Sequence, residues 1–191
     1  MTDQNEARLV KRAKQGDMHA FEELIIQHEK IVYNVALRMM NHSEDAKDIS
    51  QEVFLKAYRN IGNFDERSQF STWIYRITAN TCIDEMRKRK GRQSFSLEEE
   101  LESEEGSMQR QVADAGETPV ESMLREEQKS EILQALESLS PEHKVAVILR
   151  DIKGLSYEEI AEILELTLGT VKSRISRGRN QLKQEILKLR E

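Results

Sequence analysis

Hydrophobic residues recur every three or four positions along most of the chain, and no segment alternates with the period of two that a half-buried strand requires. This pattern predicts an all-α protein. In the first half it predicts helices at about residues 6–14, 18–29, 31–40, 43–59 and 71–90. Ser43 is a suitable N-cap for the fourth of these helices, because Glu44 and Asp45 then lie in the first turn, where the helix dipole favours negative charge.

Residues 92–117 lack a sustained apolar period and are rich in Ser, Gly and acidic residues. Such a composition buries too little apolar surface to fold, so we predict a flexible acidic linker here. It joins two small helical domains at residues 1–91 and 118–191. A flexible chain of this length has an end-to-end distance of roughly 28 Å, so the two domains could occupy separate binding sites.

The second domain contains clear helix-start signals. Each combines an N-cap residue with a proline in the first turn or with the glutamate of a capping box, and they lie at 118–121, 140–141 and 156–159. The last signal predicts a short helix at 157–164, a tight turn at 165–168 and a longer helix that ends near residue 189. A short helix, a tight turn and a longer basic helix follow the order of a helix-turn-helix.

The last helix has two distinct faces. Apolar and small residues fall on one stripe with the 3.6-residue period of a buried face: Val171, Ile175, Gly178, Leu182 and Ile186. The opposite face is polar and basic, and comprises Gly169, Ser173, Ser176, Arg177 and Asn180, with Lys172 beside it and Arg174 and Arg179 on its flanks. Side chains opposite the buried stripe can reach base edges in a major groove, whereas flanking arginines meet phosphates. Gly169 and Thr170 are predicted to offer free N–H groups to an anion at the helix start.

The alternative for this helix is an ordinary solvated basic face on a small bundle. The DNA-binding interpretation is favoured because no acidic residue interrupts the face before Glu185 and because a correctly spaced partner helix precedes it.

The charge distribution also favours nucleic acid as a partner. The net charge of −6 argues against a polyanion, but local field rather than total charge decides where DNA docks. Residues 87–92 read Arg-Lys-Arg-Lys-Gly-Arg, and residues 169–191 carry seven basic side chains against two acidic ones. Between these basic zones, residues 98–105 contain six glutamates.

Other functional classes find little support. The chain has 191 residues and no stretch that approaches the roughly 20 apolar residues of a membrane span. Its N-terminus has no signal sequence, so we expect a soluble cytoplasmic protein. Cys82 is the only cysteine and the four histidines are scattered, so no metal or other cofactor is expected. No phosphate loop or nucleophile–base pair indicates an enzyme or a small-molecule substrate.

The first domain contains an acidic stripe. Asp45, Asp48 and Glu52 lie at i, i+3 and i+7 of one predicted helix. The stripe is either a solvated face or a docking surface for a basic partner helix, and the residues alone favour neither.

Aromatic residues gather at the junction between a loop and the next helix: Phe64, Phe70, Trp73 and Tyr75. Such a cluster is usually part of a core. Arg76, Asn80 and Arg87 nevertheless align on another face of the same helix, beside Trp73. Aromatic rings next to a basic stripe are typical of sites for unpaired nucleic-acid strands, and Asn80 could hydrogen-bond a base edge.

Four segments of the chain carry a resemblance to a known family. They are residues 48–54 (DISQEVF), 70–80 (FSTWIYRITAN), 155–161 (LSYEEIA) and 169–174 (GTVKSR). Together and in this order they resemble the extracytoplasmic-function (ECF) sigma factors of bacteria, most closely the sigma-W and sigma-E branches. The resemblance covers nearly the whole chain except the acidic linker. It departs from the family at Thr167, where relatives often have proline, and at Ser176, where a larger side chain is common.

The resemblance implies a division of labour between the domains. The first domain would be sigma region 2, and its helix with Asp45, Asp48, Gln51 and Glu52 would dock on the clamp helices of core RNA polymerase. Region 2 would also hold the minus-ten promoter element as a single strand, through Asn63, Phe64, Trp73, Arg76, Asn80 and Arg87. The second domain would be sigma region 4, and its last helix would read the minus-thirty-five element as duplex through Gly169, Thr170, Lys172, Ser173, Arg174, Ser176, Arg177, Arg179 and Asn180.

The family also implies an anti-sigma factor, commonly anchored in the membrane, and a role in a stress or envelope response. The alternative function is a stand-alone helix-turn-helix regulator that binds duplex DNA without polymerase. Such a regulator needs a dimerisation helix, and residues 121–139 are too short and too charged to provide one convincingly.

Overall fold

The computed structural model describes residues 2–96 and 131–190, which form helices and turns without any strand. The predicted all-α class is therefore confirmed. Among the helices of these two segments, none combines the length and the apolar character that a membrane span requires. The predicted helix start at 118–121 and most of the predicted linker lie outside the described residues.

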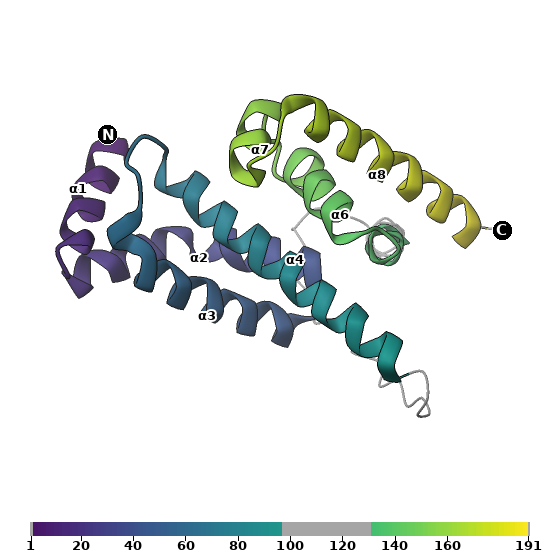
Figure 1. Ribbon diagram of the computed structural model, residues 1–191, viewed down its shortest axis with the longest axis horizontal. Coiled ribbons are helices and arrows are strands. Elements are labelled where there is room, and N and C mark those ends of the chain that lie inside the picture. The colour runs from purple at the N-terminus through teal and green to yellow at the C-terminus, as the bar shows by residue number, and fades with distance from the viewer. Residues whose placement is uncertain (1, 97–130, 191) are drawn as a thin grey trace, which may run out of the picture.

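The N-terminal bundle consists of long helices joined by short turns (Figure 1). They are α1 (Thr2–Lys14), α2 (Met18–Met40), α3 (Ser43–Asn60) and α4 (Phe70–Ser96), with a 3₁₀ turn at Ile61–Asn63 after α3. The prediction of separate helices at 18–29 and 31–40 was wrong, because the exposed Glu29 and Lys30 interrupt the apolar pattern but not the backbone. Helix α4 also continues past its predicted end near residue 90, since a helix tolerates a glycine such as Gly91 at a cost of about 1 kcal/mol.

The caps of α2 and α3 fix the turns of this bundle. Asp17 caps α2 by accepting a hydrogen bond from the N–H of Ala20 at 3.1 Å, and this bond, together with Arg12, holds the pKa of Asp17 below its usual value. Asn41 ends α2 in the left-handed conformation, with φ of 56°. The N-cap of α3 is His42 rather than the predicted Ser43, and its side chain makes no capping hydrogen bond.

The C-terminal bundle begins with helical residues 131–137 and continues with α6 (Pro141–Val147), a π-helical turn η2 (Ile148–Ile152), α7 (Tyr157–Leu164) and α8 (Leu168–Leu189). Ser140 caps α6, and Ser156 forms the predicted capping box with Glu159 at the start of α7. Thr167 caps α8 by accepting a hydrogen bond from the N–H of Thr170. The predicted order of short helix, turn and longer helix is confirmed.

Helix α8 packs closely on α6 through its predicted stripe. Val171, Ile175 and Gly178 are buried, and Leu182 and Ile186 are partly buried. A Cβ atom added at Gly178 would lie only 2.7 Å from Cγ2 of Val147 on α6, so the close approach of these two helices requires a residue without a side chain there.

Helix α4 lies between the other N-terminal helices and the C-terminal bundle (Figure 1). It packs against α2 and α3, and also against α6 and α7. Buried residues of both bundles form one continuous hydrophobic cluster, which includes Ile74 and Cys82 of α4, Ile148 of η2 and Ile160 of α7. The two bundles therefore share a core in this structure.

Candidate functional site

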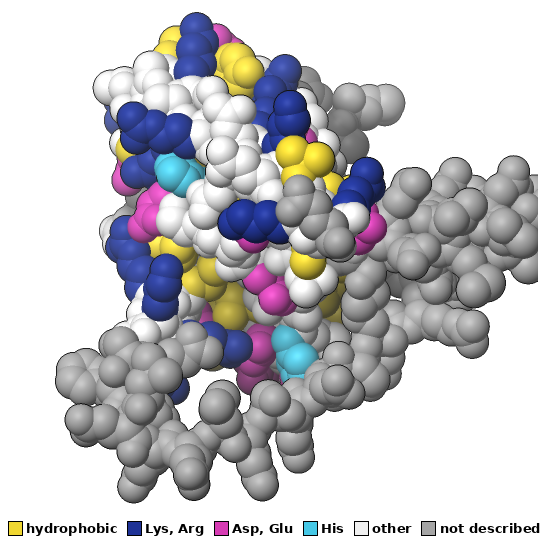
Figure 2. Space-filling view, turned by 90° about the vertical axis from the view of Figure 1, so that its right-hand side faces the viewer, with side chains coloured by type: hydrophobic (Ala, Val, Ile, Leu, Met, Phe, Trp, Pro, Cys, Tyr) yellow, Lys and Arg dark blue, Asp and Glu magenta, His cyan; other side chains and the backbone are white. Residues whose placement is uncertain are grey.

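The polar face of α8 is available to a partner. Its exposed residues are Gly169, Lys172, Ser173, Ser176, Arg177, Arg179 and Asn180, while Thr170 and Arg174 are partly buried. Figure 2 shows lysine and arginine side chains gathered over the upper part of one end of the molecule, where α8 lies in Figure 1. The periodicity of the sequence thus separated the buried and exposed faces correctly.

The start of α8 differs from the prediction. The N–H of Thr170 is not free for an anion, because it donates to Oγ1 of Thr167 at 3.3 Å. The hydroxyls of these two threonines are also 2.9 Å apart, within hydrogen-bonding distance. Thr167 therefore serves as a side-chain cap of α8.

The two arginines in the middle of α8 have different environments. Arg179 donates from Nε to Oδ2 of Asp151 at 3.0 Å and forms an ion pair with the same carboxylate, which raises the pKa of Arg179. Arg177 is exposed and forms no ion pair within the described part of the chain. Arg177 is therefore the freer of the two to meet a base.

The acidic stripe of α3 is only partly free. Asp45 accepts two hydrogen bonds from Arg89 of α4, at 2.6 and 2.7 Å. This pairing lowers the pKa of Asp45 and raises that of Arg89. Glu52 pairs with Lys56 at 2.7 Å one turn along the helix, whereas Asp48 and Gln51 are exposed. Asp45 therefore ties α3 to α4, while Asp48 and Gln51 point to solvent.

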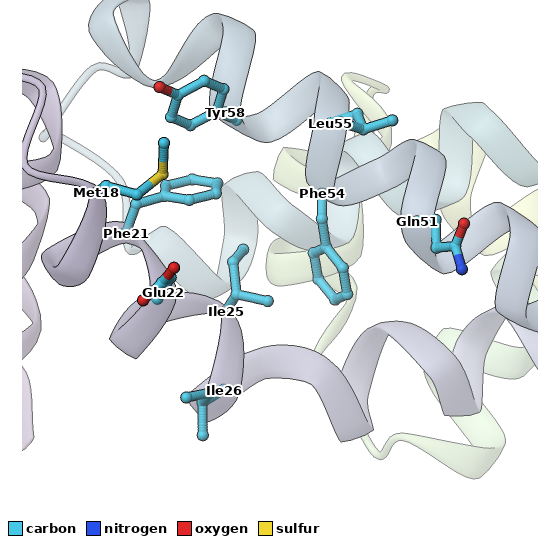
Figure 3. A pocket seen from close by; sticks show the side chains of 9 residues that line it. All are labelled: Met18, Phe21, Glu22, Ile25, Ile26, Gln51, Phe54, Leu55 and Tyr58. Carbon is cyan, nitrogen blue, oxygen red and sulfur yellow. The ribbon is translucent and has the colours of Figure 1, made fainter.

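An apolar groove beside this stripe was missed by sequence reasoning. It has a volume of about 700 Å³ and lies between α2 and α3, where its lining residues are Met18, Phe21, Glu22, Ile25, Ile26, Gln51, Phe54, Leu55 and Tyr58. Figure 3 shows Phe21, Ile25 and Phe54 pointing into the space between the helices, with Gln51 at one end. Ile26 and Leu55 are 66% and 54% exposed. The sequence did contain a signal for this groove. Leu55 and Tyr58 are large apolar side chains that do not share the helical period of the buried Val53 and Ala57, so they lie on a different face of α3.

Aromatic residues pack together where the loop between α3 and α4 meets α4. Phe64 is only 4% exposed, and its ring contacts Phe70 and Trp73 at centroid distances of 5.8 and 5.0 Å. The Nζ of Lys14 donates to the carbonyl of Phe64 at 3.0 Å and to Glu66 at 3.1 Å. A hollow of about 230 Å³ lies between this loop and α1. Phe64 is thus a core residue in this conformation, and Trp73 is the partly exposed ring.

The predicted basic residues of α4 lie on one helix, but the two arginines among them form ion pairs with the C-terminal bundle. Asn63 and Asn80 are exposed. Arg76 contacts Glu165 and Arg87 contacts Glu142, both in the C-terminal bundle. Trp73 lies one turn before Arg76 on the same helix, so the aromatic and basic groups are adjacent.

The described residues contain no group of three or more His, Cys, Asp or Glu side chains that could hold a metal ion. Cys82 is fully buried, and burial raises its pKa to about 12. Its thiol therefore stays protonated at neutral pH.

The geometry first defines a class of protein. A helix-turn-helix with an exposed basic face, joined to a second bundle with its own basic and apolar surfaces, is typical of a DNA-binding protein that also binds another protein. Comparisons with known families and proteins agree with this class. Residues 24–92 match sigma-70 region 2, and residues 129–182 match sigma-70 region 4.

Curated relatives match over almost the whole chain. The ECF RNA polymerase sigma factor SigW of Bacillus subtilis is 36% identical over 93% of this chain and 94% of its own. The ECF RNA polymerase sigma-E factor of Escherichia coli is 35% identical over 93% of this chain and 92% of its own. The chain therefore belongs to the ECF sigma factors. The match to region 2 favours this family over the alternative of a stand-alone helix-turn-helix regulator.

Solved structures show the same fold. The sigma factor RpoE in complex with the anti-sigma factor NepR from Bartonella quintana has a TM-score of 0.65 and 27% identity, and the match covers 90% of this chain and 98% of that one. CnrH in complex with the cytosolic domain of CnrY has a TM-score of 0.65 at 22% identity, with 94% and 96% covered.

Proposed function

We propose that this protein is an alternative sigma factor that binds core RNA polymerase and directs it to a specific set of promoters. The single observation that carries the proposal is the presence of both sigma regions in one chain. This role is one of binding rather than catalysis, and it is exercised in the cytoplasm together with the polymerase.

Core polymerase would dock on α3 and on the groove beside it. Asp48 and Gln51 supply exposed polar groups, and Leu55 and Ile26 supply exposed apolar surface next to them. Buried apolar area provides most of the free energy of such contacts, while charges set orientation and association rate. Asp45 contributes indirectly, because its pairing with Arg89 fixes α3 relative to α4.

The minus-ten element would be held as a single strand along α4 and the preceding loop. The hollow beside the loop is bordered by Ser68 and Gln69, and Asn80 is exposed on α4. An aromatic ring supplies a stacking platform for an unpaired base, and arginines attract its phosphates. Trp73 would supply the ring, and Arg76 and Arg87 would supply the positive charge.

The minus-thirty-five element would be read as duplex by α8. The exposed Lys172, Ser173, Ser176 and Arg177 lie opposite the stripe that packs on α6, so they face outward when the bundle sits on DNA. A bidentate contact between arginine and guanine is the commonest specific contact in a major groove. Arg177 is the best placed residue for it.

Regulation by an anti-sigma factor is part of the same proposal. The sigma factor RpoE from Bartonella quintana, which has a similar fold, was solved in complex with the anti-sigma factor NepR. The apolar groove between α2 and α3 and the exposed face of α8 are surfaces that such a factor would mask.

The test is a transcription assay with purified core RNA polymerase on fragments of the source genome. We expect transcripts with defined start sites only when both the polymerase and this protein are present. The control is core polymerase alone. Tight sequence-specific DNA binding by the free protein, with no association with polymerase, would contradict the proposal.

A further inference from the structure

Helix α1 lies before residues 24–92, which match sigma-70 region 2, and the proposed function gives this helix no role. It nevertheless contacts the 3₁₀ turn at Ile61–Asn63, so it lies beside the minus-ten loop, residues 61–69, which leads into α4 (Figure 1). The last residue of α1, Lys14, reaches this loop with its side chain.

Lys14 is joined to two separate points of the minus-ten loop. Its Nζ donates to the carbonyl oxygen of Phe64 at 3.0 Å and to Oε1 of Glu66 at 3.1 Å. The bond to the carbonyl is partly buried, and hydrogen bonds from a charged donor are roughly twice as strong as neutral ones. One ammonium group therefore fixes the backbone at Phe64 relative to the side chain of Glu66.

The other hydrogen bonds of the minus-ten loop are local. Arg67 bonds to Asp65 through its backbone N–H and through its guanidinium, and the N–H of Ser68 donates to the carbonyl of Asp65 at 3.3 Å. Within the part of the chain that the structure describes, Lys14 is the only side chain outside the loop and α4 that hydrogen-bonds to the loop. Without Lys14 the loop keeps the buried ring of Phe64 as an anchor but loses its polar tether to the rest of the domain.

Helix α1 is a firm support for this tether. Leu9, Val10 and Ala13 are buried in the hydrophobic cluster of the bundle. Near the end of the helix, Arg12 forms an ion pair with Asp17 at 2.6 Å, and Asp17 in turn caps α2. The position of Lys14 is therefore set by the packing of α1 and not by the loop that Lys14 binds.

The hollow of about 230 Å³ beside the minus-ten loop lies between these two parts. One wall belongs to α1 and includes Glu6 and Val10, and the other belongs to the loop and includes Ser68 and Gln69. The shape of the hollow depends on how the loop sits relative to α1, and Lys14 fixes that relation through its two hydrogen bonds.

We propose that Lys14 is a positioning residue for recognition of the minus-ten element: it holds the minus-ten loop in the shape that discriminates between bases. Lys14 acts through the loop, because its ammonium group is occupied by Phe64 and Glu66. Loss of Lys14 therefore reduces selectivity among bases more than it reduces the overall attraction for the strand. The inference rests on the proposed function, in which this loop and α4 hold the minus-ten strand.

The test compares transcription by holoenzymes reconstituted from core RNA polymerase and each variant. The templates are a promoter recovered in the transcription assay and its single-base variants across the minus-ten element. Lys14→Met removes both hydrogen bonds but keeps an unbranched side chain. We expect the preference for the favoured base to fall about fivefold at one position, which corresponds to the net contribution of one hydrogen bond. Lys14→Arg keeps the charge and can donate to both acceptors, so it should retain the wild-type ranking.

Lys11→Met is the matched control, because Lys11 is exposed on the same helix and the variant removes the same charge. It should retain the wild-type ranking of templates. An unchanged ranking in Lys14→Met, or a loss by the same factor on every template, would overturn the role of Lys14. Absence of any transcript with the wild-type protein would instead overturn the proposed function.

Hydrogen exchange of the free protein tests the tether without DNA or polymerase. Residues 61–69 should exchange faster in Lys14→Met than in Lys11→Met, while equal exchange in α2 and α3 shows that the fold is intact. Glu66→Ala removes one of the two hydrogen bonds, so exchange of the loop in this variant should lie between that of the wild type and that of Lys14→Met. Equal exchange of the loop in Lys14→Met and Lys11→Met would show that Lys14 does not hold the loop, and would overturn the proposal.

Discussion

Arg179 of α8 and Asp151 of the π-helical turn form an ion pair in which Nε of Arg179 donates to Oδ2 of Asp151 at 3.0 Å. A basic side chain on the flank of α8 is thus neutralised by its own domain. Arg179 was predicted from the sequence to meet phosphate, and that role requires this pair to loosen.

Asp151→Asn should therefore release Arg179 toward the phosphates. We expect the salt-dependence slope of binding to the minus-thirty-five duplex to increase by about one unit, as for one additional phosphate contact. The double variant with Arg179→Ala should return the slope to the wild-type value. A salt titration of both variants checks this, and an unchanged slope in Asp151→Asn would show that Arg179 does not reach DNA.

Arg177→Ala should alter specificity rather than overall affinity alone. Arg177 is exposed and forms no ion pair with another residue that the structure describes, so its guanidinium can meet a base. We expect a loss of ~1–3 kcal/mol on the preferred sequence and a flattened ranking at one base pair. A panel of single-base promoter variants measures it, with Lys183→Ala, at an exposed position further along α8, as the control. If every sequence weakens by the same factor, Arg177 contacts phosphate.

Asp48→Lys should impair assembly with core polymerase. Asp48 is exposed on α3, next to the groove that contains Gln51 and Leu55, so reversal of its charge changes the docking surface and not the core. We expect at least a tenfold weaker association in a competition assay, and unchanged thermal unfolding. Glu29→Lys, exposed on α2, is the control. Normal assembly of Asp48→Lys would refute the docking assignment.

Asn80→Ala should weaken capture of the minus-ten single strand. Asn80 is exposed on α4, and the loss of one hydrogen bond to a base corresponds to about 1 kcal/mol. Binding of the minus-thirty-five duplex should not change. Asp84→Ala, one turn along the same helix, is the control. Equal losses on both DNA substrates would mean that Asn80 supports the fold instead.

The pairing of Asp45 with Arg89 predicts a dependence of stability on pH. The pKa of Asp45 in the native state lies below its ordinary value of 3.8, so the stabilisation is present above that pH and is lost as the pH falls through the lowered native value. Both side chains are partly exposed, so Asp45→Asn should cost about 1 kcal/mol or less at pH 7. Chemical unfolding at pH 7 and at pH 2 checks this, and the difference from wild type should shrink at pH 2. Asp48→Asn serves as the control.

Much of the local structure could be predicted from the sequence. The capping box of Ser156 with Glu159, the cap at Ser140 and the buried stripe of α8 depend on residues a few positions apart, so spacing alone reveals them. The local errors have the same origin. A break was predicted near residue 30, where the polar pair Glu29 and Lys30 weakens the apolar pattern without ending the helix. The end of α4 was placed too early, because the single Gly91 weakens a helix without ending it.

Which surfaces meet was decided only by the tertiary structure. Arg76 was correctly placed on a basic face of α4, yet its partner Glu165 lies 89 residues away. The ion pair of Asp151 with Arg179 and the groove between α2 and α3 likewise depend on how separate helices pack. Periodicity specifies which face of a helix is buried, because that follows from the 3.6-residue turn. It carries no information about which distant helix covers that face, since that is set by complementary shape and charge in three dimensions.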